Sequence, residues 1–419
     1  MNEQLLQYTW QFQYFNSTGL TTQQGENISI LHPGNLNKNQ GPDFLDAKIK
    51  IGDTTWAGNI ELHIYSSNWR DHKHSGDKNY KNIILHVVWE DDVDLDLPFP
   101  VAELKGRISR VLLEKYNGLM QSVTGIPCER QINTVDELIW ASWKQRLLVE
   151  RLIERSVIIV QHLENTNNHW DEVFWRLLAK NFGIKVNAEA FERMAVSLPV
   201  SILAKHKDQI HQLEALLLGQ ANILHGEFED DYCVILQKEY DFLQKKYKLQ
   251  PVNINLHYLR MRPSNFPSLR LAQLAMLIHQ SSHLFSKIIA SVSLKEIKQL
   301  LDITANDYWH YHYRPGEPSS FKKKKLGKQM IDNILINTVV PVLFAYGHYL
   351  NETKYKERAL AWLEEIAAEK NSITKIFSEA GIIIKSAFDS QALIQLKNHY
   401  CNNKRCLDCA AGNNILKRG

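Results

Sequence analysis

The chain has 419 residues, of which 44% are hydrophobic and ten are tryptophan. This composition excludes a disordered protein, and the length exceeds what one compact core usually holds, so we expect two or three structural units. The 49 basic residues nearly balance the 46 acidic ones and leave a formal charge of +3. Net charge therefore does not indicate nucleic-acid binding, although a local basic patch would be compatible with it.

The start of the chain lacks the basic and then apolar pattern of a secretory signal. The most apolar late window, residues 334–346, is interrupted by Asn337 and Pro341 and is too short to span a bilayer. We therefore expect a cytoplasmic protein.

Short β-rich runs and turns dominate the chain up to about residue 130. Residues 28–31 predict a first strand, and residues 83–89 predict a buried strand that follows a short helical or loop segment. Two alternating runs on either side of Gly52-Asp53 predict a β-hairpin, because this pair suits a tight turn. A first helix is predicted ahead of these strands from Leu5, Leu6, Trp10, Phe12 and Phe15.

Side-chain alternation in the second hairpin strand, residues 56–65, places Glu61 and His63 on one face. Asp43 stands just before the first hairpin strand, where it can reach the end at which Glu61 lies. The hairpin therefore predicts two carboxylates and a nitrogen base in one place. The opposite, largely apolar face consists of Trp56, Gly58, Ile60, Leu62 and Ile64.

Carboxylate oxygens suit Mg²⁺ or Mn²⁺, which offset the charge of a phosphodiester and activate a water. In this interpretation Asp43 and Glu61 are metal ligands and catalytic residues. His63 then orients the water or stabilises the transition state. The alternative is that Glu61 is a solvated polar residue on a half-exposed strand.

The order Pro42-Asp43, followed by Glu61-Leu62-His63, resembles the PD-(D/E)xK nuclease superfamily, with His63 in the lysine position. The predicted α-β-β-β-α-β order is similar to the core of that superfamily. The resemblance implies a restriction-endonuclease-like core that cleaves DNA or RNA with Mg²⁺ or Mn²⁺, in repair, recombination or defence. A degenerate core that binds nucleic acid or acts as a scaffold is the second hypothesis. The whole chain also resembles an uncharacterised bacterial family of similar length.

A polar cluster, residues 66–80, lies between the hairpin and the buried strand. In the superfamily that the chain resembles, residues after the glutamate strand complete the active site or contact the DNA backbone. His72 and His74 are thus candidates for a base, a ligand or phosphate contacts. Asp77 is a candidate further catalytic residue. A solvated loop is the alternative.

Three of the five cysteines, Cys401, Cys406 and Cys409, lie within nine residues. In a chain without a secretory signal, this spacing indicates metal binding or redox chemistry rather than disulfides. A fourth ligand would complete a zinc site or a 4Fe–4S cluster; Cys128 is the first candidate and His399 the second. The arrangement resembles the iron–sulfur staple of helicase-associated exonucleases, although Cys128 follows the nuclease core instead of preceding it.

A 3.6-residue apolar pattern takes over from about residue 135 and predicts an irregular helical domain. One face of its first long helix is expected to contain Leu138, Ile139, Trp143, Leu147, Leu148, Leu152 and Ile153. Cys233 is expected to be a core residue. Further helices are predicted at residues 170–182, 210–218, 233–247, 268–283, 294–300, 325–349 and 354–370.

Three arginines, Arg260, Arg262 and Arg270, lie around the predicted helix start at Pro267-Ser268. They would form either a phosphate-binding site or a set of buried side chains that tie helices together.

The expected protein is thus α+β, with a restriction-endonuclease-like α/β core at residues 1–128. An irregular all-helical domain at residues 129–395 and a Cys-rich tail at residues 396–419 follow.

Overall fold

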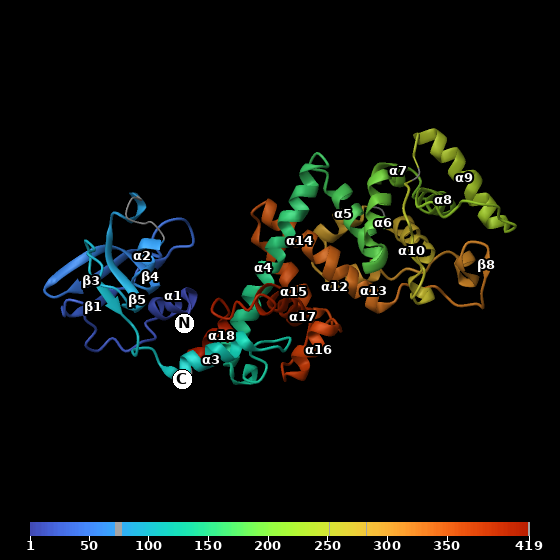
Figure 1. Ribbon diagram of the computed structural model, residues 1–419. Helices are drawn as coiled ribbons and strands as arrows, with labels where there is room; N and C mark the ends of the chain where they lie inside the picture. Colours follow the sequence, from blue (N-terminus) through green and yellow to red (C-terminus); the bar gives the residue numbers. More distant parts are fainter. Residues whose placement is uncertain (72–77, 251, 282, 418–419) are drawn as a thin grey trace. The chain divides into compact units, whose positions relative to one another are not determined.

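A computed structural model describes residues 1–71, 78–250, 252–281 and 283–417. The chain divides into two compact units (Figure 1). The first, here called the sheet unit, consists of Met1–Trp143, Ile376–Ile382 and Leu396–Gly419. The second, the helical unit, consists of Lys144–Lys375 and Ile383–Gln395. The protein is therefore α+β, as expected, with a sheet-containing part followed by a helical one.

The sheet unit begins with helix α1 (Glu3–Gln11), which Asn2 caps by accepting a hydrogen bond from the Leu5 amide at 2.9 Å. Its strands are β1 (Ile28–His32), β2 (Asn35–Leu36), β3 (Phe44–Ile51), β4 (Thr54–Tyr65), β5 (Ile83–Glu90) and β6 (Val101–Glu103). The remaining elements are α2 (Asn68–Asp71), η2 (Lys78–Tyr80), α3 (Arg110–Gln121), η3 (Ile132–Thr134), η7 (Leu396–Cys401) and α18 (Ala410–Lys417).

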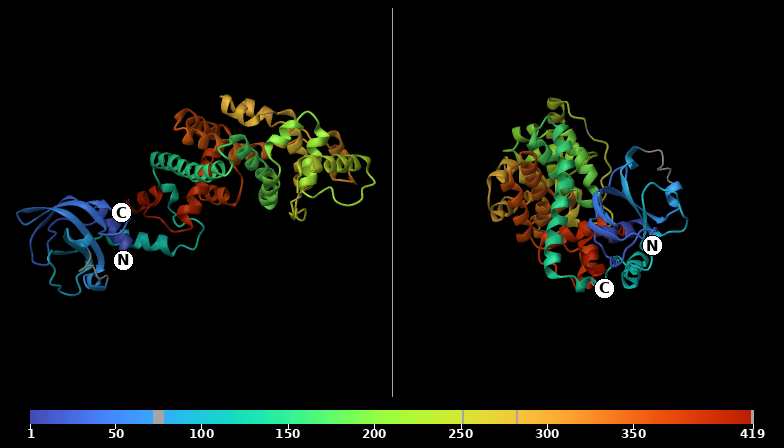
Figure 2. Two further views of the ribbon diagram at one scale, coloured as in Figure 1. Left: turned by 90° about the horizontal axis from the view of Figure 1, so that it is seen from above. Right: turned by 90° about the vertical axis from the view of Figure 1, so that its left-hand side faces the viewer.

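The strands form one sheet in the order β1-β3-β4-β5-β6, with β2 paired to β3. The strands are drawn in blue in Figure 2. β1, β3 and β4 run antiparallel, and the tight turn at Gly52, whose φ is +58°, joins β3 to β4. β5 then runs parallel to β4, and β6 parallel to β5. A parallel partner requires a crossover connection, which α2 and η2 provide here. The predicted first strand, hairpin and buried strand are confirmed.

The two faces of the sheet are covered differently. One face packs against α1 in the main apolar core, where Trp10, Phe44 and Ile60 are all 0% exposed. On the other, a smaller cluster forms from Trp69, Ile83, Leu95 and Phe99. Trp56 is 49% exposed, because it lies beyond the part of β4 that the core covers.

The close pairing of β4 with β5 depends on Gly58. A Cβ atom at this position would lie 2.5 Å from the Ile84 side chain and 2.7 Å from the Asn82 carbonyl oxygen. A larger residue would therefore push β4 and β5 apart, and this pairing fixes the positions of the residues that follow on β4.

The helical unit consists mainly of α-helices with one small hairpin. Its first helix, α4 (Glu137–Glu164), starts within the sheet unit. The next helices are α5 (Trp170–Phe182), α6 (Ile184–Ser197), α7 (Val200–Lys205), α8 (Ile210–Gln220), α9 (Asp231–Tyr247), η4 (Pro263–Asn265), α10 (Pro267–Gln280), α11 (Leu284–Ala290) and α12 (Leu294–Leu300). Then follow η5 (Asp307–Tyr311), β7 (His312–Arg314), β8 (Glu317–Pro318), α13 (Lys328–Ile334), η6 (Leu335–Val339), α14 (Val340–Tyr349), α15 (Thr353–Glu365), α16 (Ser372–Glu379) and α17 (Ala387–Gln395). The second half of α16, from Ile376, belongs to the sheet unit.

Most of the predicted helices are present, but several boundaries were wrong. The helix predicted at residues 268–283 ends at Gln280, and the one predicted at residues 354–370 ends at Glu365. In the first helix, α1, the regular structure stops at Gln11, so Phe12 and Phe15 lie outside it. The predicted face of α4 is buried at Leu147 and Leu148, whereas Leu138 is 85% and Ile153 41% exposed. Both lie where neighbouring elements do not cover the helix.

A single helical stretch among the described residues, Lys328–Tyr349, is long and apolar enough to cross a membrane by length and composition. It is longer than the window expected from the sequence, because the helix continues through Asn337 and Pro341 with a π-helical turn. Of its most apolar segment, 78% is buried inside the fold. This burial is that of a core helix and is consistent with a soluble protein.

Candidate functional site

The hairpin places the Asp43 and Glu61 carboxylates side by side. Asp43 lies immediately before β3, and its amide donates a hydrogen bond to Glu61 Oε2 at 3.0 Å. In return, Asp43 Oδ2 accepts from the Leu62 amide at 3.0 Å. Gln7 on α1 donates from Nε2 to Asp43 Oδ1 at 2.8 Å. Three elements thus hold the two carboxylates in place.

Asp43 and Glu61 can carry like charges, and the Glu61 side chain has little access to solvent. Glu61 is only 5% exposed, and burial raises the pKa of its carboxyl to about 8, with the negative charge of Asp43 adding to the effect. A smaller contribution in the same direction comes from Glu3 on α1. The hydrogen bond from the Asp43 amide lowers the pKa, but it does not outweigh burial. A buried pair of carboxylates is stabilised by a proton or by a cation.

His63 joins this pair to a second histidine that lies on the next strand. Its Nε2 atom is 3.7 Å from Glu61 Oε1, and its Nδ1 atom is 2.9 Å from His86 Nε2. His63 and His86 are 1% and 0% exposed. Because the two ring nitrogens of a neutral imidazole differ, one of the two rings donates in the His63–His86 contact and the other accepts. Glu61, His63 and His86 therefore form a continuous polar row across β4 and β5.

Aromatic residues cover the histidines on the side away from the main core. The Trp69 ring on α2 lies 6.3 Å from the His63 ring and 5.4 Å from the His86 ring, measured between centroids. Phe99 packs against Trp69 at 4.9 Å. This cover keeps water away from the histidine pair and fixes the planes of both rings.

A cavity of about 560 Å³ adjoins the site through Gln7, which lines it and also binds Asp43. Lys38, Lys404 and Arg405 line it as well, and all three are exposed. Arg405 pairs with Asp408 at 2.9 Å, and Lys404 donates to the Met120 carbonyl. Since Asp408 also lines the cavity and pairs with Arg405, the positive charge of the wall comes from Lys38 and Lys404, and Gln7 is the lining residue that contacts Asp43.

No group of three or more His, Cys, Asp or Glu side chains within the described ranges is arranged to hold a metal ion. Asp43 and Glu61 still provide the oxygen ligands that Mg²⁺ accepts, since this ion usually binds one or two protein carboxylates and keeps several waters. Of the other candidates from the sequence, His72, His74 and Asp77 lie outside the described residues.

The structure gathers the cysteine trio and Cys128 in the sheet unit. All are free thiols; Cys406 and Cys409 are each 7% exposed, and Cys128 and Cys401 are partly buried. Burial raises the pKa of the Cys128 and Cys406 thiols to about 12. Cys233 is 0% exposed within α9, as expected for a core residue.

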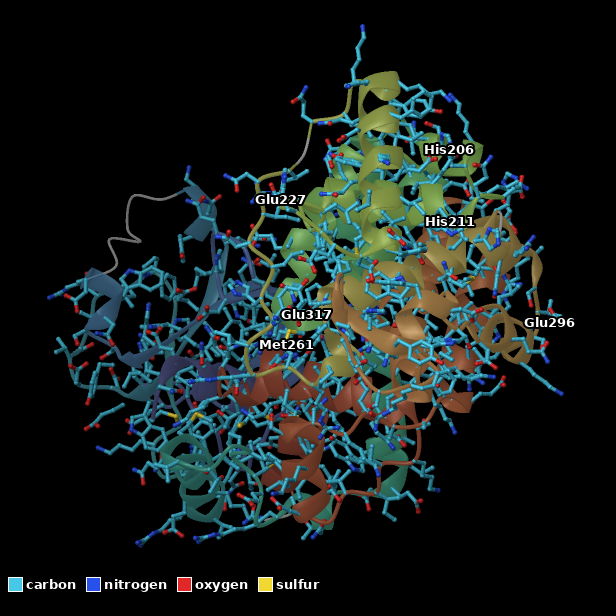
Figure 3. The ribbon with its side chains drawn as sticks, turned by 90° about the vertical axis from the view of Figure 1, so that its right-hand side faces the viewer. His206, His211, Glu227, Met261, Glu296 and Glu317 are labelled. Carbon is cyan, nitrogen blue, oxygen red and sulfur yellow. The ribbon has the colours of Figure 1, made fainter. Side chains whose placement is uncertain are left out.

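The three candidate arginines of the helical unit differ from one another. Arg270 is 6% exposed and donates to Gln273 Oε1 at 2.8 Å and to Asn265 Oδ1 at 2.6 Å, which is the buried, helix-tying arrangement. Arg260 and Arg262 are exposed. Their segment is held to α6 by Asn187, which donates to Met261 Sδ at 3.7 Å (Met261 is labelled in Figure 3).

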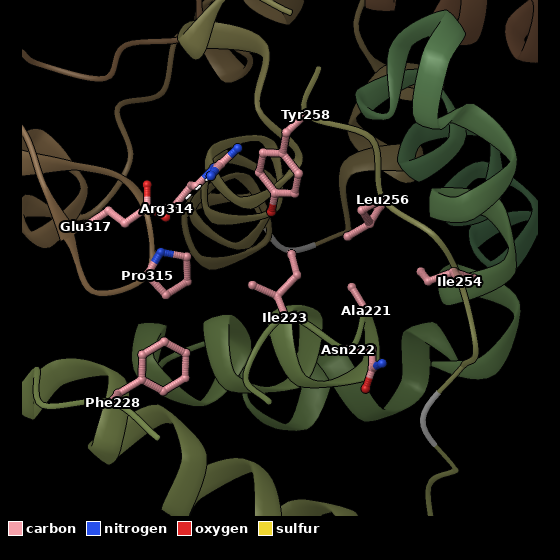
Figure 4. A pocket seen from close by; sticks show the side chains of 10 residues that line it. All are labelled: Ala221, Asn222, Ile223, Phe228, Ile254, Leu256, Tyr258, Arg314, Pro315 and Glu317. Atoms are coloured by element: carbon pink, nitrogen blue, oxygen red, sulfur yellow. Dashed lines mark hydrogen bonds and ion pairs between the residues drawn. The ribbon is translucent and has the colours of Figure 1, made fainter. Parts of the chain in front are cut away.

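A second cavity, of about 400 Å³, lies within the helical unit (Figure 4). Its cationic residue is Arg314, whose guanidinium lies 4.4 Å from the centre of the Tyr258 ring and 3.4 Å from Glu317 Oε1. These contacts already compensate the charge of Arg314, so this cavity resembles a packed ionic cluster more than an open anion site.

Three contributors to the hairpin site were missed in the sequence. His86 lies at the site because it pairs with Glu61 in the parallel register of β4 and β5. In the sequence, the one sign of its position was a single histidine inside an apolar strand. Gln7 and Glu3 come from α1, a helix that the apolar pattern predicted without indicating which polar residues face the strands.

A family model described as "Protein of unknown function (DUF2851)" matches residues 3–372, and the chain therefore belongs to that family. This agrees with the expected membership of an uncharacterised family. Comparison with curated proteins and with solved structures gives no match. The comparisons give no support to the PD-(D/E)xK resemblance, which stays a prediction. The matched segment contains the hairpin site and Cys128 and stops before the cysteine trio.

Proposed function

We propose that the sheet unit is a divalent-metal-dependent nuclease that cleaves phosphodiester bonds in DNA or RNA in the cytoplasm. The observation that carries this proposal is the pair of backbone hydrogen bonds that fixes the Asp43 and Glu61 carboxylates beside each other. Each carboxylate accepts a backbone amide from the strand of the other, at 3.0 Å in both cases. Such a pair, in which Glu61 is buried and Asp43 half-buried, suits a bound cation.

The order of the elements gives independent support. Helix α1 is followed by the antiparallel strands β1, β3 and β4, with the two-residue strand β2 between β1 and β3, and then by α2, η2 and the parallel strand β5. This is similar to the core of the PD-(D/E)xK nucleases, in which the aspartate precedes one strand and the glutamate lies on the next. Asp43 and Glu61 occupy those two places.

The residues present fit a hard divalent cation. Asp43 and Glu61 would hold Mg²⁺ or Mn²⁺, which would offset phosphate charge and make a water more acidic. Gln7 orients Asp43 through its hydrogen bond to Oδ1. The backbone amides that bind both carboxylates keep them from turning away, so their geometry is set before substrate arrives.

His63 replaces the lysine of the superfamily in this proposal. Its Nε2 atom faces Glu61, where it can hold or deliver a proton near the reacting phosphate. His86 fixes the ring through Nδ1. A hydrogen-bonding partner such as His86 usually holds a histidine ring in one orientation and one tautomer.

The cavity beside Gln7 would receive the substrate backbone. Lys38 is exposed on its wall and has no acidic partner among the ion pairs of the described residues. Positively charged side chains of this kind contact phosphates without reading sequence. In the helical unit, the exposed Arg260 and Arg262 are further candidates for backbone contacts.

The second hypothesis, a nuclease-like core that only binds nucleic acid, is favoured by the burial of the histidine. His63 is 1% exposed and is already bonded to His86. A residue so enclosed would need the cover to open before it could act on a phosphate. In that case the cavity would bind a strand, and the repair, recombination or defence role would be one of scaffolding.

Cleavage of labelled single- and double-stranded DNA and RNA by the full chain, with Mg²⁺ or Mn²⁺, separates the two hypotheses. We expect Glu61→Gln to slow cleavage by about 100-fold or more. Glu103→Gln is the matched control, because Glu103 is exposed on β6 of the same sheet. Binding without cleavage by the wild type would favour the scaffold, and equal cleavage by Glu61→Gln would remove the hairpin from the reaction.

A further inference from the structure

The segment with the cysteine trio folds back onto the sheet unit. Cys406 belongs to the same apolar cluster as α1 and the sheet, and Cys128 and Leu407 pack against that cluster. The Lys404 side chain, in the turn after Cys401, donates to the Met120 carbonyl near the end of α3, the helix that precedes Cys128. In agreement with this contact, the pKa of each of the Cys128, Cys401 and Cys406 thiols is raised in part by other thiols of the group. Four thiols from two segments more than 270 residues apart in sequence therefore share one small volume.

The turn that contains Cys406 and Cys409 is closely packed against the start of α18. Burial raises the pKa of the Cys409 thiol, and the amides of Gly412 and Ala411 at the start of α18 oppose this rise. The Cys409 amide donates to the Cys406 carbonyl at 3.4 Å, which brings the two cysteines of the Cys-Leu-Asp-Cys turn together. Amide groups directed at sulfur orient thiolates and favour their charged form.

Gly412 allows this turn to close on the helix. A Cβ atom at this position would lie 2.2 Å from the Cys406 carbonyl oxygen. The ring of Tyr400, next to Cys401, packs against Trp143 at 5.1 Å. The three cysteines of the trio are thus held by tight local packing and not by a loose tail.

We propose that Cys128, Cys401, Cys406 and Cys409 bind one structural Zn²⁺. Four cysteine sulfurs are the complete ligand set of a closed, tetrahedral zinc site. In the described residues these sulfurs are gathered but are not arranged around a common point. Rotation of the cysteine side chains between staggered conformers re-aims the sulfurs without moving the backbone. Four cysteine sulfurs also bind a 4Fe–4S cluster, and the metal analysis below distinguishes the two by iron content and visible absorbance.

The ion would fix one wall of the cavity that adjoins the hairpin site. Asn403, Lys404, Arg405, Leu407 and Asp408 line this cavity, and all lie between Cys401 and Cys409. The zinc proposal itself stands apart from the nuclease proposal, because it concerns other residues and is read out by metal content.

Metal analysis of the full chain, purified without chelator and then dialysed against a Zn²⁺-containing buffer, tests the proposal. We expect about one zinc per chain, falling to less than about a fifth in Cys406→Ser and in Cys409→Ser. Cys233→Ser is the matched control and retains the zinc, since this thiol lies in the helical unit.

The wild type alone gives a decisive reading if the variants fold poorly. The site is supported if the wild type contains stoichiometric zinc and if a chelator both removes this zinc and lowers the unfolding temperature. Iron and visible absorbance in place of zinc, or no bound metal after incubation with Zn²⁺, overturns it. Zinc retained in all three variants places the metal elsewhere and also overturns it.

Discussion

Two buried glutamates, Glu61 in the sheet unit and Glu214 in the helical unit, make an instructive pair. They are 5% and 0% exposed, and burial raises their carboxyl pKa values to about 8 and about 7. Glu214 accepts a hydrogen bond from the Tyr232 hydroxyl at 2.5 Å. Glu61 instead faces the carboxylate of Asp43, which pushes its pKa in the same direction as burial.

The comparison of Glu61 with Glu214 shows that the burial of a carboxyl group does not by itself indicate a function. A single carboxyl group in a core is made tolerable by a proton and a hydroxyl donor, and Glu214 needs nothing more. With a pKa of about 8, the Glu61 carboxyl group also takes up a proton at neutral pH, and a divalent cation bound between Glu61 and Asp43 would take the place of that proton. A raised pKa alone therefore does not indicate a site, whereas a raised pKa beside a second carboxylate supports the proposed one.

The largest expected effect is on cleavage activity, which should depend on the hairpin carboxylates of the sheet unit but not on Glu214 of the helical unit. Asp43→Asn should reduce metal-dependent cleavage by about 100-fold or more, because it removes one of the two proposed ligands. Glu214→Gln should leave the rate per folded molecule unchanged, since the amide still accepts from Tyr232. Single-turnover cleavage by both variants measures this. A similar loss of cleavage in both variants would mean that the hairpin carboxylates and Glu214 do not differ in function as proposed.

A smaller loss is expected when the histidine row is shortened. His86→Ala should lower the cleavage rate by about 10- to 100-fold, because His63 loses the partner that sets its tautomer. His63→Lys should restore the pattern of the superfamily and retain more activity than His63→Ala. Rates measured across pH 6 to 9 would also reveal a changed profile in His86→Ala, which a merely structural effect would not produce.

Stability without added divalent metal should fall with rising pH in both regions. A carboxyl group whose folded pKa exceeds the usual 4.5 binds protons more tightly in the folded state, so unfolding becomes easier as pH rises towards the folded value. The window is pH 4.5 to about 8 for Glu61 and pH 4.5 to about 7 for Glu214.

Urea unfolding at pH 5 and pH 8.5 measures this loss. Glu61→Gln should be more stable than the wild type at pH 8.5 by about 1–3 kcal/mol, given about 1.4 kcal/mol per unit of pKa. Added Mg²⁺ should narrow that gap, whereas it should not change the gap between wild type and Glu214→Gln. An identical response to Mg²⁺ in both cases would contradict the assigned difference.

The smallest effect concerns the basic wall of the cavity. Lys38→Ala should weaken nucleic-acid binding several-fold for all sequences and reduce the dependence of log affinity on log salt by about one. Lys50→Ala is the control, because Lys50 is exposed on β3 and does not line the cavity. Titrations at three salt concentrations give the slope. An unchanged slope in Lys38→Ala would exclude a phosphate contact there.

Sequence patterns predicted the local parts of this site well. Alternation in β4 put Glu61 and His63 on one face, and the turn at Gly52-Asp53 brought Asp43 to them. His86 could not be predicted, because the parallel register of β4 and β5 depends on a crossover and not on local pattern. The exposure of Leu138 on α4 was missed for a similar reason: periodicity shows which residues share a face but not where the neighbouring elements end.

The most direct test of the cation site is Mn²⁺ binding to the full chain at pH 7.5, followed by calorimetry. Mn²⁺ favours carboxylate oxygen over cysteine sulfur, so it reports the hairpin and not the cysteines. The account predicts one site per chain that is lost in Glu61→Gln and in Asp43→Asn and retained in Glu214→Gln. Absence of Mn²⁺ binding to the wild type, or binding that survives both hairpin substitutions, would contradict it.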